Sequence, residues 1–411
     1  MTASVLTIGD EILIGKIVNT NASYVSKVLN ENGIACVSQI TCPDNESEIV
    51  SSLNILTAKS DLIIVTGGLG VTKDDITKQV VAKYVGVELE VNEEARDNTH
   101  KYYSDREIEV CADVDGFYTL PIGATMLKNT VGVAAGFVLN FNKKKIAVFP
   151  GPPAELIPMF ENEFLPILKS LNGGNIITKY FKIFGLRELE VVEKVRDLMQ
   201  FEADGIFLTT YCGVCDVALV MRFSSKVAMS LVGDMIFEIT QRFSRNLYSF
   251  TNEELEQALL GVMESKHSAI AVAESVSGGM IASKLVSVPR MGQHLVESMV
   301  TYSDESKVSR LGVLPDTLKT YGAVSENVAR EMCLGLLSNH LTQYVISTTG
   351  FAGPIGADEN EEVGLCYIGI GTPQQIKVFK HNFVGTREII RQACSKQALF
   401  YLLNLIKYNE L

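Results

Sequence analysis

The feature that most restricts the fold is a regular alternation of strand-like and helix-like segments from the first residues onward. Runs of small and apolar residues at 4–9, 34–40 and 61–68 have the length of buried strands. The centre of the third run is continuously apolar, as is typical of the middle of a parallel sheet. Residues 20–33 place apolar side chains at helical spacing, and residues 72–85 are predicted to form a further helix. The alternation predicts an α/β fold with a doubly wound N-terminal sheet.

Glycines and acidic residues gather where these predicted strands end, which is the edge at which open α/β sheets bind ligands. A Gly-Gly-x-Gly turn follows the third strand and can present backbone N–H groups to a phosphate. Its spacing fits neither a Rossmann fingerprint nor a Walker A loop. The candidate phosphate-binding residues at this edge are Gly67, Gly68, Gly70 and Thr72.

Three carboxylates at the same edge could hold a divalent metal ion that bridges this phosphate. Asp10 follows the first strand, and Asp74 and Asp75 follow the glycine turn. The alternative is a tight turn whose acidic residues cap helices. We expect Asn21 and Lys16 to be structural or solvated rather than ligand contacts.

A second candidate site begins at Ser275, where the strand-like run at 268–274 ends. A Ser-Gly-Gly turn of Ser277, Gly278 and Gly279 follows it and opens an apolar, helix-like segment. Glycines allow close backbone approach, and the N–H groups of such a turn can face an anion. The position therefore suits a nucleophile beside a site for negative charge.

Serine needs a neighbouring base to act as a nucleophile, and none of the five histidines falls in a motif-like setting. Lys307 is the nearest credible base, since a desolvated lysine can lose its proton near neutral pH. A Ser–Lys pair is a known variant of the catalytic triad. Tyr302 lies a few residues earlier, so one loop or helix start could carry both. The alternative has Ser275 as a helix cap, Tyr302 as a half-buried aromatic residue and Lys307 as a solvated charge.

The pattern divides the chain into three predicted domains. Residues 1–170 hold the doubly wound sheet, residues 171–250 form a small α+β linker domain, and residues 251–411 form a C-terminal α/β domain. Within the linker, Cys212 and Cys215 make a lone Cys-x-x-Cys pair between two apolar runs. Without a second pair or a suitably spaced histidine, we expect a hairpin turn there and no zinc or redox site.

The charge balance argues against two classes of partner. The 411 residues carry a formal net charge of −12 without an evident basic patch, which disfavours direct nucleic-acid binding and contact with anionic membranes. No apolar run approaches the roughly 20 residues that a membrane-spanning helix needs. The N-terminus lacks the basic region of a signal peptide, and the eight cysteines are scattered, as expected of reduced thiols. These features predict a cytoplasmic protein that is not bound to membranes.

Five segments of the C-terminal third occur in an order that resembles the C-terminal domain of the competence/damage-inducible (CinA) family. That domain is similar to nicotinamide mononucleotide deamidases. The segments are AESVSGG (273–279), TYSDESKVSRLGV (301–313), YGAVSENVAREM (321–332), TTGFAGPIG (348–356) and GLCYIGIG (364–371).

The resemblance implies hydrolysis of the carboxamide of nicotinamide mononucleotide to nicotinate mononucleotide and ammonia. Ser275 would attack the amide carbon, Lys307 would act as the general base, and Tyr302 would assist proton transfer or orient the pair. Turn N–H groups near residues 277–279 would stabilise the oxyanion. No metal ion or other cofactor is needed for this step. The further expected substrate contacts are Thr349 and Gly350. Arg387 and Arg391 lie one turn apart near the start of the predicted C-terminal helix, and an arginine such as Arg387 could bind the phosphate. The alternative is that both arginines belong to a solvated helix face.

The N-terminal half resembles the molybdopterin-binding fold shared with molybdenum cofactor biosynthesis proteins. The segments that carry this resemblance are GDEILIGKIVNTNA (9–22), TGGLGVTKDDIT (66–77) and PGPPAEL (150–156). In the CinA family this domain is associated with an ADP-ribose pyrophosphatase activity that depends on a divalent metal ion. The resemblance therefore implies a bifunctional hydrolase of small-molecule nucleotides, and a symmetric homodimer is the default assembly for such an enzyme.

The chain departs from the family pattern at a few positions. Val71 replaces the proline of the usual GGLGPT, and Ile355 replaces a glycine of the usual AGPGG. Val276 and Ser277 replace the cysteine and threonine of the usual ESCTGG, and Ser277 keeps the threonine hydroxyl. Ile355 adds a bulky side chain at the expected pocket loop. We expect the departures to affect substrate preference more than catalysis.

Two other functions stay open on this reading. The family name allows a non-catalytic recruitment protein in competence or the DNA-damage response. The N-terminal fold alone allows a molybdopterin-binding enzyme. Because fold is weak evidence of function, substrate assays must separate these alternatives from a hydrolase.

Overall fold

The computed structural model describes residues 1–109, 114–172, 176–339, 342–354 and 362–409. The chain divides into two compact units, which are Met1–Thr178 with Phe223–Lys226, and Lys179–Arg222 with Val227–Leu411. No helix in the described ranges combines the length and the apolar character that a membrane crossing requires.

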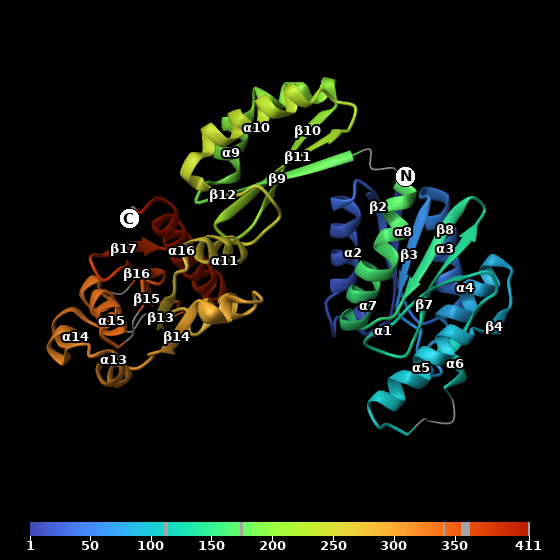
Figure 1. The fold of residues 1–411 in the computed structure, drawn as a ribbon, viewed down its shortest axis with the longest axis horizontal. Coiled ribbons are helices and arrows are strands. Elements are labelled where there is room, and N and C mark those ends of the chain that lie inside the picture. Colours follow the sequence, from blue (N-terminus) through green and yellow to red (C-terminus); the bar gives the residue numbers. More distant parts are fainter. Residues whose placement is uncertain (110–113, 173–175, 340–341, 355–361, 410–411) are drawn as a thin grey trace. The chain divides into compact units, whose positions relative to one another are not determined.

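The first unit is built on a six-stranded mixed sheet (Figure 1). Its first four strands in sheet order are mutually parallel, and two antiparallel strands extend one edge. This arrangement confirms the predicted α/β fold of the N-terminal domain. In sheet order the strands are β2 (Ala35–Cys42), β1 (Thr2–Ile8), β3 (Leu62–Thr66), β8 (Lys144–Phe149), β7 (Gly136–Phe141) and β6 (Thr125–Leu127).

The remaining elements of this unit are mostly helices, and β4 (Leu89–Val91) pairs separately with β5 (Thr119–Pro121). A π-helical turn at Phe160–Phe164 joins the last two helices. The helices are α1 (Asp10–Leu13), α2 (Thr20–Glu31), α3 (Glu46–Lys59), α4 (Thr77–Val85), α5 (Glu93–Asp105), α6 (Asp115–Tyr118), α7 (Pro153–Met159) and α8 (Leu165–Asn172).

Helices cover both faces of this sheet because successive side chains of a strand point to opposite sides. Ala3 and Val5 of β1 belong to a core that also contains side chains of α2 and α7. Leu6 and Ile8 belong to a second core with α3 and α4. The sheet is therefore buried on both faces, which leaves the carboxyl ends of its strands as the open edge.

The second unit contains two sheets. In the five-stranded sheet, β13 pairs in parallel with both β14 and β15, and β16 and β17 continue it antiparallel. In sheet order its strands are β14 (Leu295–Val300), β13 (Ile270–Glu274), β15 (Tyr344–Gly350), β16 (Leu365–Gly371) and β17 (Ile376–Asn382). The smaller sheet has the order β10 (Ile206–Cys212), β11 (Asp216–Ser224), β9 (Ile176–Phe184) and β12 (Leu247–Ser249).

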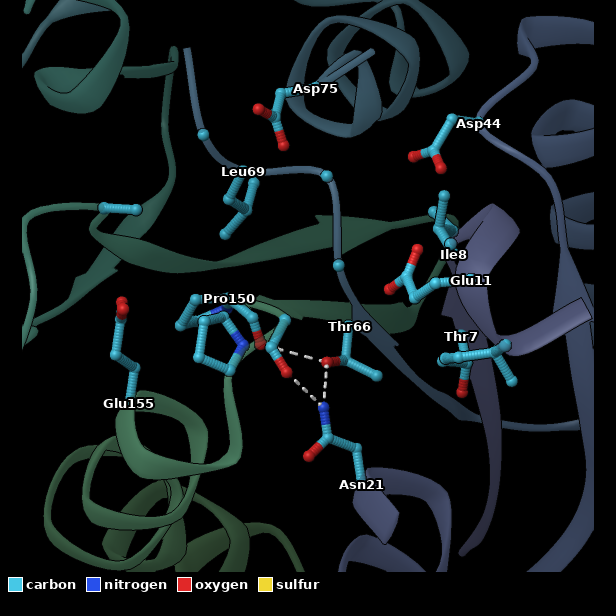
Figure 2. Close-up of a pocket in the computed structure, with 18 of the residues that line it drawn as sticks. Thr7, Ile8, Glu11, Asn21, Asp44, Thr66, Leu69, Asp75, Pro150 and Glu155 are labelled. Atoms are coloured by element: carbon cyan, nitrogen blue, oxygen red, sulfur yellow. Dashed lines mark hydrogen bonds between the residues drawn. The ribbon is translucent and has the colours of Figure 1, made fainter. Parts of the chain in front are cut away.

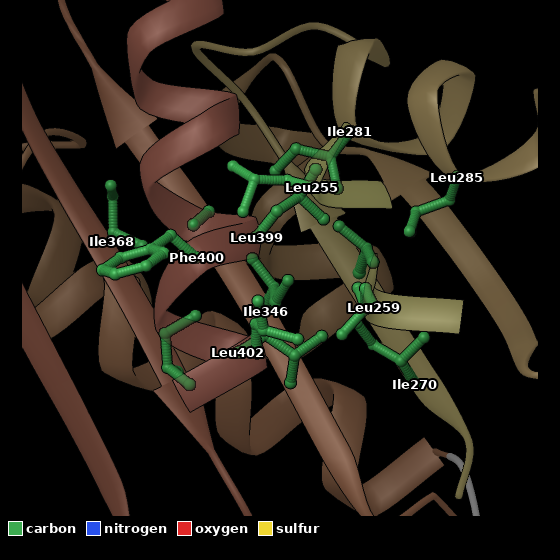
Figure 3. Close-up of a cluster of buried hydrophobic side chains, with 14 of the residues drawn as sticks. Leu255, Leu259, Ile270, Ile281, Leu285, Ile346, Ile368, Leu399, Phe400 and Leu402 are labelled. Atoms are coloured by element: carbon green, nitrogen blue, oxygen red, sulfur yellow. The ribbon is translucent and has the colours of Figure 1, made fainter. Parts of the chain in front are cut away.

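Helices cover the five-stranded sheet on both faces. Side chains of α11, α12 and α16 share a core with β13, which Figure 3 shows around Leu259 and Ile346. Side chains of α13 and α15 form a second core with Ala271 and Ala273, on the other side of β13. The helices of this unit are α9 (Glu188–Val195), α10 (Met229–Phe243), α11 (Leu255–Lys266), α12 (Met280–Val286), α13 (Asp304–Leu311), α14 (Pro315–Tyr321), α15 (Glu326–Asn339) and α16 (Arg387–Tyr408), with 3-10 turns at Leu198–Asp204, Ser244–Asn246 and Met291–Gln293.

The smaller sheet packs on the C-terminal helix within the same unit. The ring of Phe184 in β9 stacks on Phe400 of α16 with centroids 4.3 Å apart. Lys396 of the same helix lies 3.1 Å from Asp216 at the start of β11. β10 ends at Cys212, and the Gly213 N–H donates to the Asp216 carbonyl at 2.8 Å, which confirms the predicted hairpin turn.

Candidate functional sites

The C-terminal cavity, of about 320 Å³, lies at the carboxyl ends of β13 and β15. Its other described lining residues are Asp304 and a set of small or apolar residues, Val276, Ala323, Val324, Phe351 and Ala352. Ile355 lies outside the described residues. The predicted site residues that line this cavity are Ser275, Tyr302, Lys307, Thr349, Gly350 and Arg387.

Backbone hydrogen bonds on both sides hold Ser275. Its N–H donates to the Thr348 carbonyl at 3.0 Å, which extends the pairing of β13 with β15 by one residue. Its carbonyl accepts from the Gly278 N–H at 3.1 Å, so the chain turns immediately after the strand. Only 8% of Ser275 is exposed. The serine is thus fixed at the wall of the cavity by the sheet beneath it.

Lys307 lies in the first turn of α13 and is 1% exposed, so the alternative of a solvated surface lysine is wrong. Its Nζ donates to the Tyr302 carbonyl at 3.1 Å and lies 3.9 Å from Asp304 Oδ1. Burial lowers the pKa of Lys307, and the charges of Asp304 and Glu305 oppose this shift. A larger fraction of this amine is therefore neutral at a given pH than for an exposed lysine, and a neutral amine can accept a proton.

Tyr302 and Arg387 form one wall of the cavity. Tyr302 is 64% exposed, more than the half-buried alternative allowed. The Arg387 guanidinium donates to the Tyr302 hydroxyl at 3.3 Å and to the Gly353 carbonyl at 2.6 Å. These bonds use two of the five guanidinium N–H donors, so the remaining donors can still bind an anion.

The Ser-Gly-Gly turn does not line this cavity. The Ser277 hydroxyl is buried in a 2.8 Å hydrogen bond with the Thr348 hydroxyl. The Gly278 N–H is bonded to Ser275, and the Gly279 N–H donates to the Glu274 carboxylate at 2.9 Å. The structure therefore does not bring Ser277, Gly278 and Gly279 together with the other predicted residues, and the glycine N–H groups are already occupied.

Glu274 is the residue that sequence reasoning missed in this site. Besides Gly279, its carboxylate accepts the N–H groups of Ile281 at 3.0 Å and Ala282 at 2.8 Å. The sequence expectation was that the start of this helix would face a substrate anion, whereas the chain's own carboxylate fills that position. A signal was present in the sequence, because Glu274 is the only charged residue in the apolar run that forms β13.

The N-terminal cavity, of about 630 Å³, lies at the carboxyl ends of β1 and β3. Figure 2 shows Asp44 and Glu11 on one side of it and Glu155 on the opposite side. The predicted residues all line this cavity, namely Gly67, Gly68, Gly70, Thr72, Asp10, Asp74 and Asp75.

The glycine turn after β3 can be built only from residues without a side chain. Gly67 and Gly68 have φ angles of +105° and +66°, in the region that disfavours other residues. A Cβ atom on Gly67 would collide with the Ile8 carbonyl, and one on Gly68 would collide with the Thr77 hydroxyl. α4 begins at Thr77 and not at residue 72 as predicted, because the intervening turn is closed by Asp75, which accepts from the Thr72 N–H at 3.0 Å and hydroxyl at 2.6 Å.

The ionisable side chains that line this cavity are all carboxylic acids among the described residues. The described residues that line it include no lysine, arginine or histidine. Burial raises the pKa of Asp44, and the charges of Asp10, Glu11 and Asp75 raise it further, against a hydrogen bond from the Asp10 N–H. Asp44 was not predicted, although it follows β2 as Asp10 follows β1. The carboxylates that line the cavity are Asp10, Glu11, Asp44, Asp74, Asp75 and Glu155.

These carboxylates do not form a ready-made metal cage. Among the described residues, no group of three His, Cys, Asp or Glu side chains is arranged to hold a metal ion, so Asp10, Asp74 and Asp75 are not a joint ligand set here. Mg²⁺ in nucleotide sites is commonly bound by one or two carboxylates together with substrate phosphates and water. The donor set fits a divalent ion that arrives with a phosphate ligand, with Asp10 and Asp44 as the pair already joined by a backbone contact.

Asn21 holds the floor of this cavity. Its amide nitrogen donates to the Thr66 hydroxyl at 3.0 Å and the Gly151 carbonyl at 2.7 Å (Figure 2). Since a carbonyl can only accept, the nitrogen must face Gly151. The Asn21 Oδ1 atom is buried without a partner among the described residues. Asn21 has the expected structural contacts, but it also lines the cavity with a free acceptor, where a ligand donor would be favourable, which the sequence did not predict.

Profiles of two families match the chain in sequence order. "Probable molybdopterin binding domain" matches residues 4–170, and "CinA C-terminal domain" matches residues 252–406. A protein of Caldicellulosiruptor saccharolyticus named as competence-damage inducible is 37% identical over 411 residues, covering 99% of both chains. One of Clostridium beijerinckii with the same name is 36% identical over 396 residues, covering 95% of this chain and 96% of its own.

Solved structures match parts of the chain. The protein CinA of Thermoplasma acidophilum is 31% identical, covers 40% of this chain and 97% of its own, and has a TM-score of 0.38. A CinA superfamily protein of Escherichia coli is 28% identical, covers 39% and 97%, and has a TM-score of 0.37. The family assignment rests on the relatives that match along nearly their whole length: this chain belongs to the CinA family, with a molybdopterin-binding-like N-terminal domain and a CinA C-terminal domain.

Proposed function

We propose that the C-terminal site hydrolyses the carboxamide of nicotinamide mononucleotide to nicotinate mononucleotide and ammonia. The observation that carries the proposal is that Ser275 and the buried Lys307 line one cavity, with the pKa of Lys307 lowered by burial. The apolar side chains of Val276, Phe351 and Ala352 offer a surface for a pyridine ring. The free donors of Arg387 can bind the phosphate.

In the proposed reaction, the Ser275 oxygen bonds to the amide carbon while the neutral Lys307 amine takes the serine proton. The resulting tetrahedral intermediate collapses when Lys307 returns this proton to the leaving nitrogen, so that ammonia departs and an acyl-serine remains. Water then adds to the acyl carbon while Lys307 takes its proton. Lys307 passes this proton to the Ser275 oxygen as the bond from that oxygen to the acyl carbon breaks, so nicotinate mononucleotide is released and the serine is restored. The N–H group of Val276, which lines the cavity and has no backbone acceptor among the described residues, is the donor we assign to the oxyanion. One such donor contributes about 2.7–4 kcal/mol in comparable sites.

The decisive assay is ammonia release from nicotinamide mononucleotide by the purified full-length protein and by Ser275→Ala. We expect turnover by the parent protein and loss of it in the variant. A protein without turnover, indistinguishable from Ser275→Ala, would favour the alternative of a non-catalytic recruitment protein.

For the N-terminal site we propose a metal-dependent ADP-ribose pyrophosphatase. The supporting observation is a glycine turn that lines a cavity with carboxylates and no cationic side chain among the described residues. A pyrophosphate cannot enter such a field unless positive charge comes with it. A divalent ion would neutralise that charge and polarise the phosphorus–oxygen bonds. The chain itself would supply N–H groups at Gly67, Gly68 and Gly70 to orient the phosphates and a carboxylate such as Asp10 or Asp44 to hold the ion.

A comparison of ligands separates this proposal from a molybdopterin-binding enzyme. Binding and hydrolysis of ADP-ribose would be measured with and without Mg²⁺ or Mn²⁺, beside binding of molybdopterin. We expect ADP-ribose to bind and to be cleaved only with the ion. Tight molybdopterin binding without ADP-ribose hydrolysis would support the alternative.

A further inference from the structure

A carboxylate lies buried beside the candidate nucleophile without lining its cavity. Glu274 is the last residue of β13 and is 0% exposed. Three backbone N–H groups and, at 3.3 Å, the Ser298 hydroxyl donate to it. No lysine, arginine or histidine of the described residues forms an ion pair with it. Burying a charge without a counterion is costly, so this carboxylate is stabilised by hydrogen bonds alone.

The bonds of Glu274 reach across the turn that carries Ser275. One oxygen accepts from Gly279 at 2.9 Å and Ile281 at 3.0 Å, and the other accepts from Ala282 at 2.8 Å. The strand end is thereby tied to the first turn of α12, and the residues between them are closed into a short loop. Gly278 and Gly279, with φ angles of +59° and +89°, allow the chain to make this reversal.

Two other groups hold the same loop at Ser277. The Thr348 hydroxyl bonds the Ser277 hydroxyl, and the Arg391 guanidinium donates to the Ser277 carbonyl at 2.9 Å. Of these three attachments, only Glu274 fixes the far end of the loop, where the helix begins. Loss of its charge would free the end of the loop while the attachments at Ser277 remain.

We propose that Glu274 is a positioning residue for Ser275, because its carboxylate binds the start of α12 in place of a substrate anion and so fixes the loop that carries the nucleophile. The proposal rests on the hydrolase function proposed above. It also has a consequence for substrate binding. With a negative charge already at the helix start, the phosphate of an anionic substrate must bind at Arg387.

The test compares Glu274→Gln and Glu274→Ala with Glu256→Gln in the full-length protein. Glu256 is a matched control, since it is also buried and contacts α12, but through Lys284 at 3.4 Å and away from Ser275. Gln keeps the shape of Glu and one acceptor oxygen, so it can satisfy only part of the bonds. Melting temperatures identify the conditions under which every variant is folded.

Two readouts distinguish positioning from general stability. The first is kcat and KM for ammonia release from nicotinamide mononucleotide. The second is the rate at which a fluorophosphonate probe labels Ser275, in which the serine oxygen bonds to phosphorus, fluoride leaves and Lys307 takes the proton. We expect Glu274→Gln to lower kcat and the labelling rate by roughly 10–100-fold with KM little changed, because small displacements of a reacting atom have effects of this size. Glu256→Gln should match the parent protein.

The outcomes separate this inference from the proposed function. Labelling of Ser275 that Glu274→Gln slows, in a protein that releases no ammonia, would retain the positioning role and reject the substrate. Parent-like kcat and labelling in folded Glu274→Gln would overturn the positioning role even if the melting temperature falls. If Glu274→Ala does not fold, Glu274→Gln still decides the question. A parent protein that is neither labelled at Ser275 nor able to release ammonia would overturn both proposals.

Discussion

Two glycine turns of this protein follow buried strands in the same way and have opposite surroundings. The turn after β3 lines its cavity with Gly67, Gly68 and Gly70, and the cavity contains no cationic side chain among the described residues. The turn after β13 lies outside its cavity, and the Gly279 N–H is bound by Glu274. One turn is open to an external anion and the other is filled by an internal one. The comparison teaches that a glycine turn at a strand end predicts close backbone approach and does not by itself predict a ligand.

The two cavities also differ in the source of the positive charge that their proposed reactions need. The C-terminal cavity contains a candidate nucleophile, a buried base and an arginine, so it can act with its own side chains. The N-terminal cavity must receive positive charge together with its ligand. Each prediction below should therefore affect one cavity and leave the other unchanged.

The largest expected effect is at Lys307. Lys307→Met should lower kcat/KM for ammonia release by about 10³-fold or more, because it removes the proposed base for Ser275. Lys307→Arg should be as inactive, since a guanidinium does not give up its proton in a protein. Lys284→Met is the control and should retain activity, because Lys284 is also mostly buried but pairs with Glu256 and does not line the cavity. Activity in Lys307→Arg would contradict the general-base role, and ADP-ribose hydrolysis should be unchanged in all three variants.

Removal of divalent ions should impair the N-terminal activity and spare the C-terminal one, the reverse of the Lys307 variants. Chelation is expected to reduce ADP-ribose hydrolysis by about 10²–10³-fold, since the ion offsets several kcal/mol of charge in such sites. Ammonia release from nicotinamide mononucleotide should be unaffected. Both activities would be measured in one preparation before and after dialysis against a chelator, and again after Mg²⁺ is restored. Equal loss of the two activities would show that the ion stabilises the fold and would remove the contrast between the cavities.

A smaller effect is expected from Gly68→Ala in the first turn. The positive φ of Gly68 disfavours alanine, and the added Cβ would collide with the Thr77 hydroxyl, so we expect the N-terminal unit to lose about 2–4 kcal/mol. Gly86→Ala is the matched control, because Gly86 has a φ of +83° and open space around it. It should cost about 1 kcal/mol. Denaturant unfolding of each variant gives both values, and equal losses would mean that the collision relaxes.

Sequence patterns predicted the architecture well because it depends on local periodicity. Continuous apolar runs at β3 and β13, and helical spacing in α2, are properties of single segments. The shared cavity of Ser275 and Lys307 was also predictable, since both follow neighbouring parallel strands whose carboxyl ends meet at one edge. Arg387 was predicted from its place near the start of the C-terminal helix, one turn before Arg391.

Sequence patterns failed where the outcome depends on which of several possible partners a side chain contacts in the folded protein. The Ser277 hydroxyl could face a substrate or a neighbouring strand, and Thr348 across the sheet decides this. The start of α4 was placed too early because the side chain of Asp75 closes a turn before the helix. Asp10, Asp74 and Asp75 share an edge of the sheet without sharing a ligand geometry. Each error concerns side-chain direction, which periodicity does not determine.

The smallest expected effect concerns how strongly Asp304 and Glu305 each raise the pKa of Lys307. Only the neutral amine can accept a proton, so ammonia release should rise with pH through the pKa of Lys307. The charges of Asp304 and Glu305 raise that pKa against the effect of burial, with Asp304 the stronger. Removing either charge therefore shifts the rise to lower pH. Asp304 is mostly exposed, so screening should keep the shift below about one pH unit.

Asp304→Asn and Glu305→Gln test this ordering, because only Asp304 lines the cavity. The pH dependence of kcat/KM would be measured for both variants at low and high salt. We expect the larger shift for Asp304→Asn and a smaller difference from the parent protein at high salt. A shift to higher pH in Asp304→Asn would mean that the titrating group is not an amine held near this carboxylate. The general base would then have to be another residue. Lys307 would no longer be the side chain that distinguishes the chemistry of the C-terminal cavity from that of the acidic N-terminal cavity.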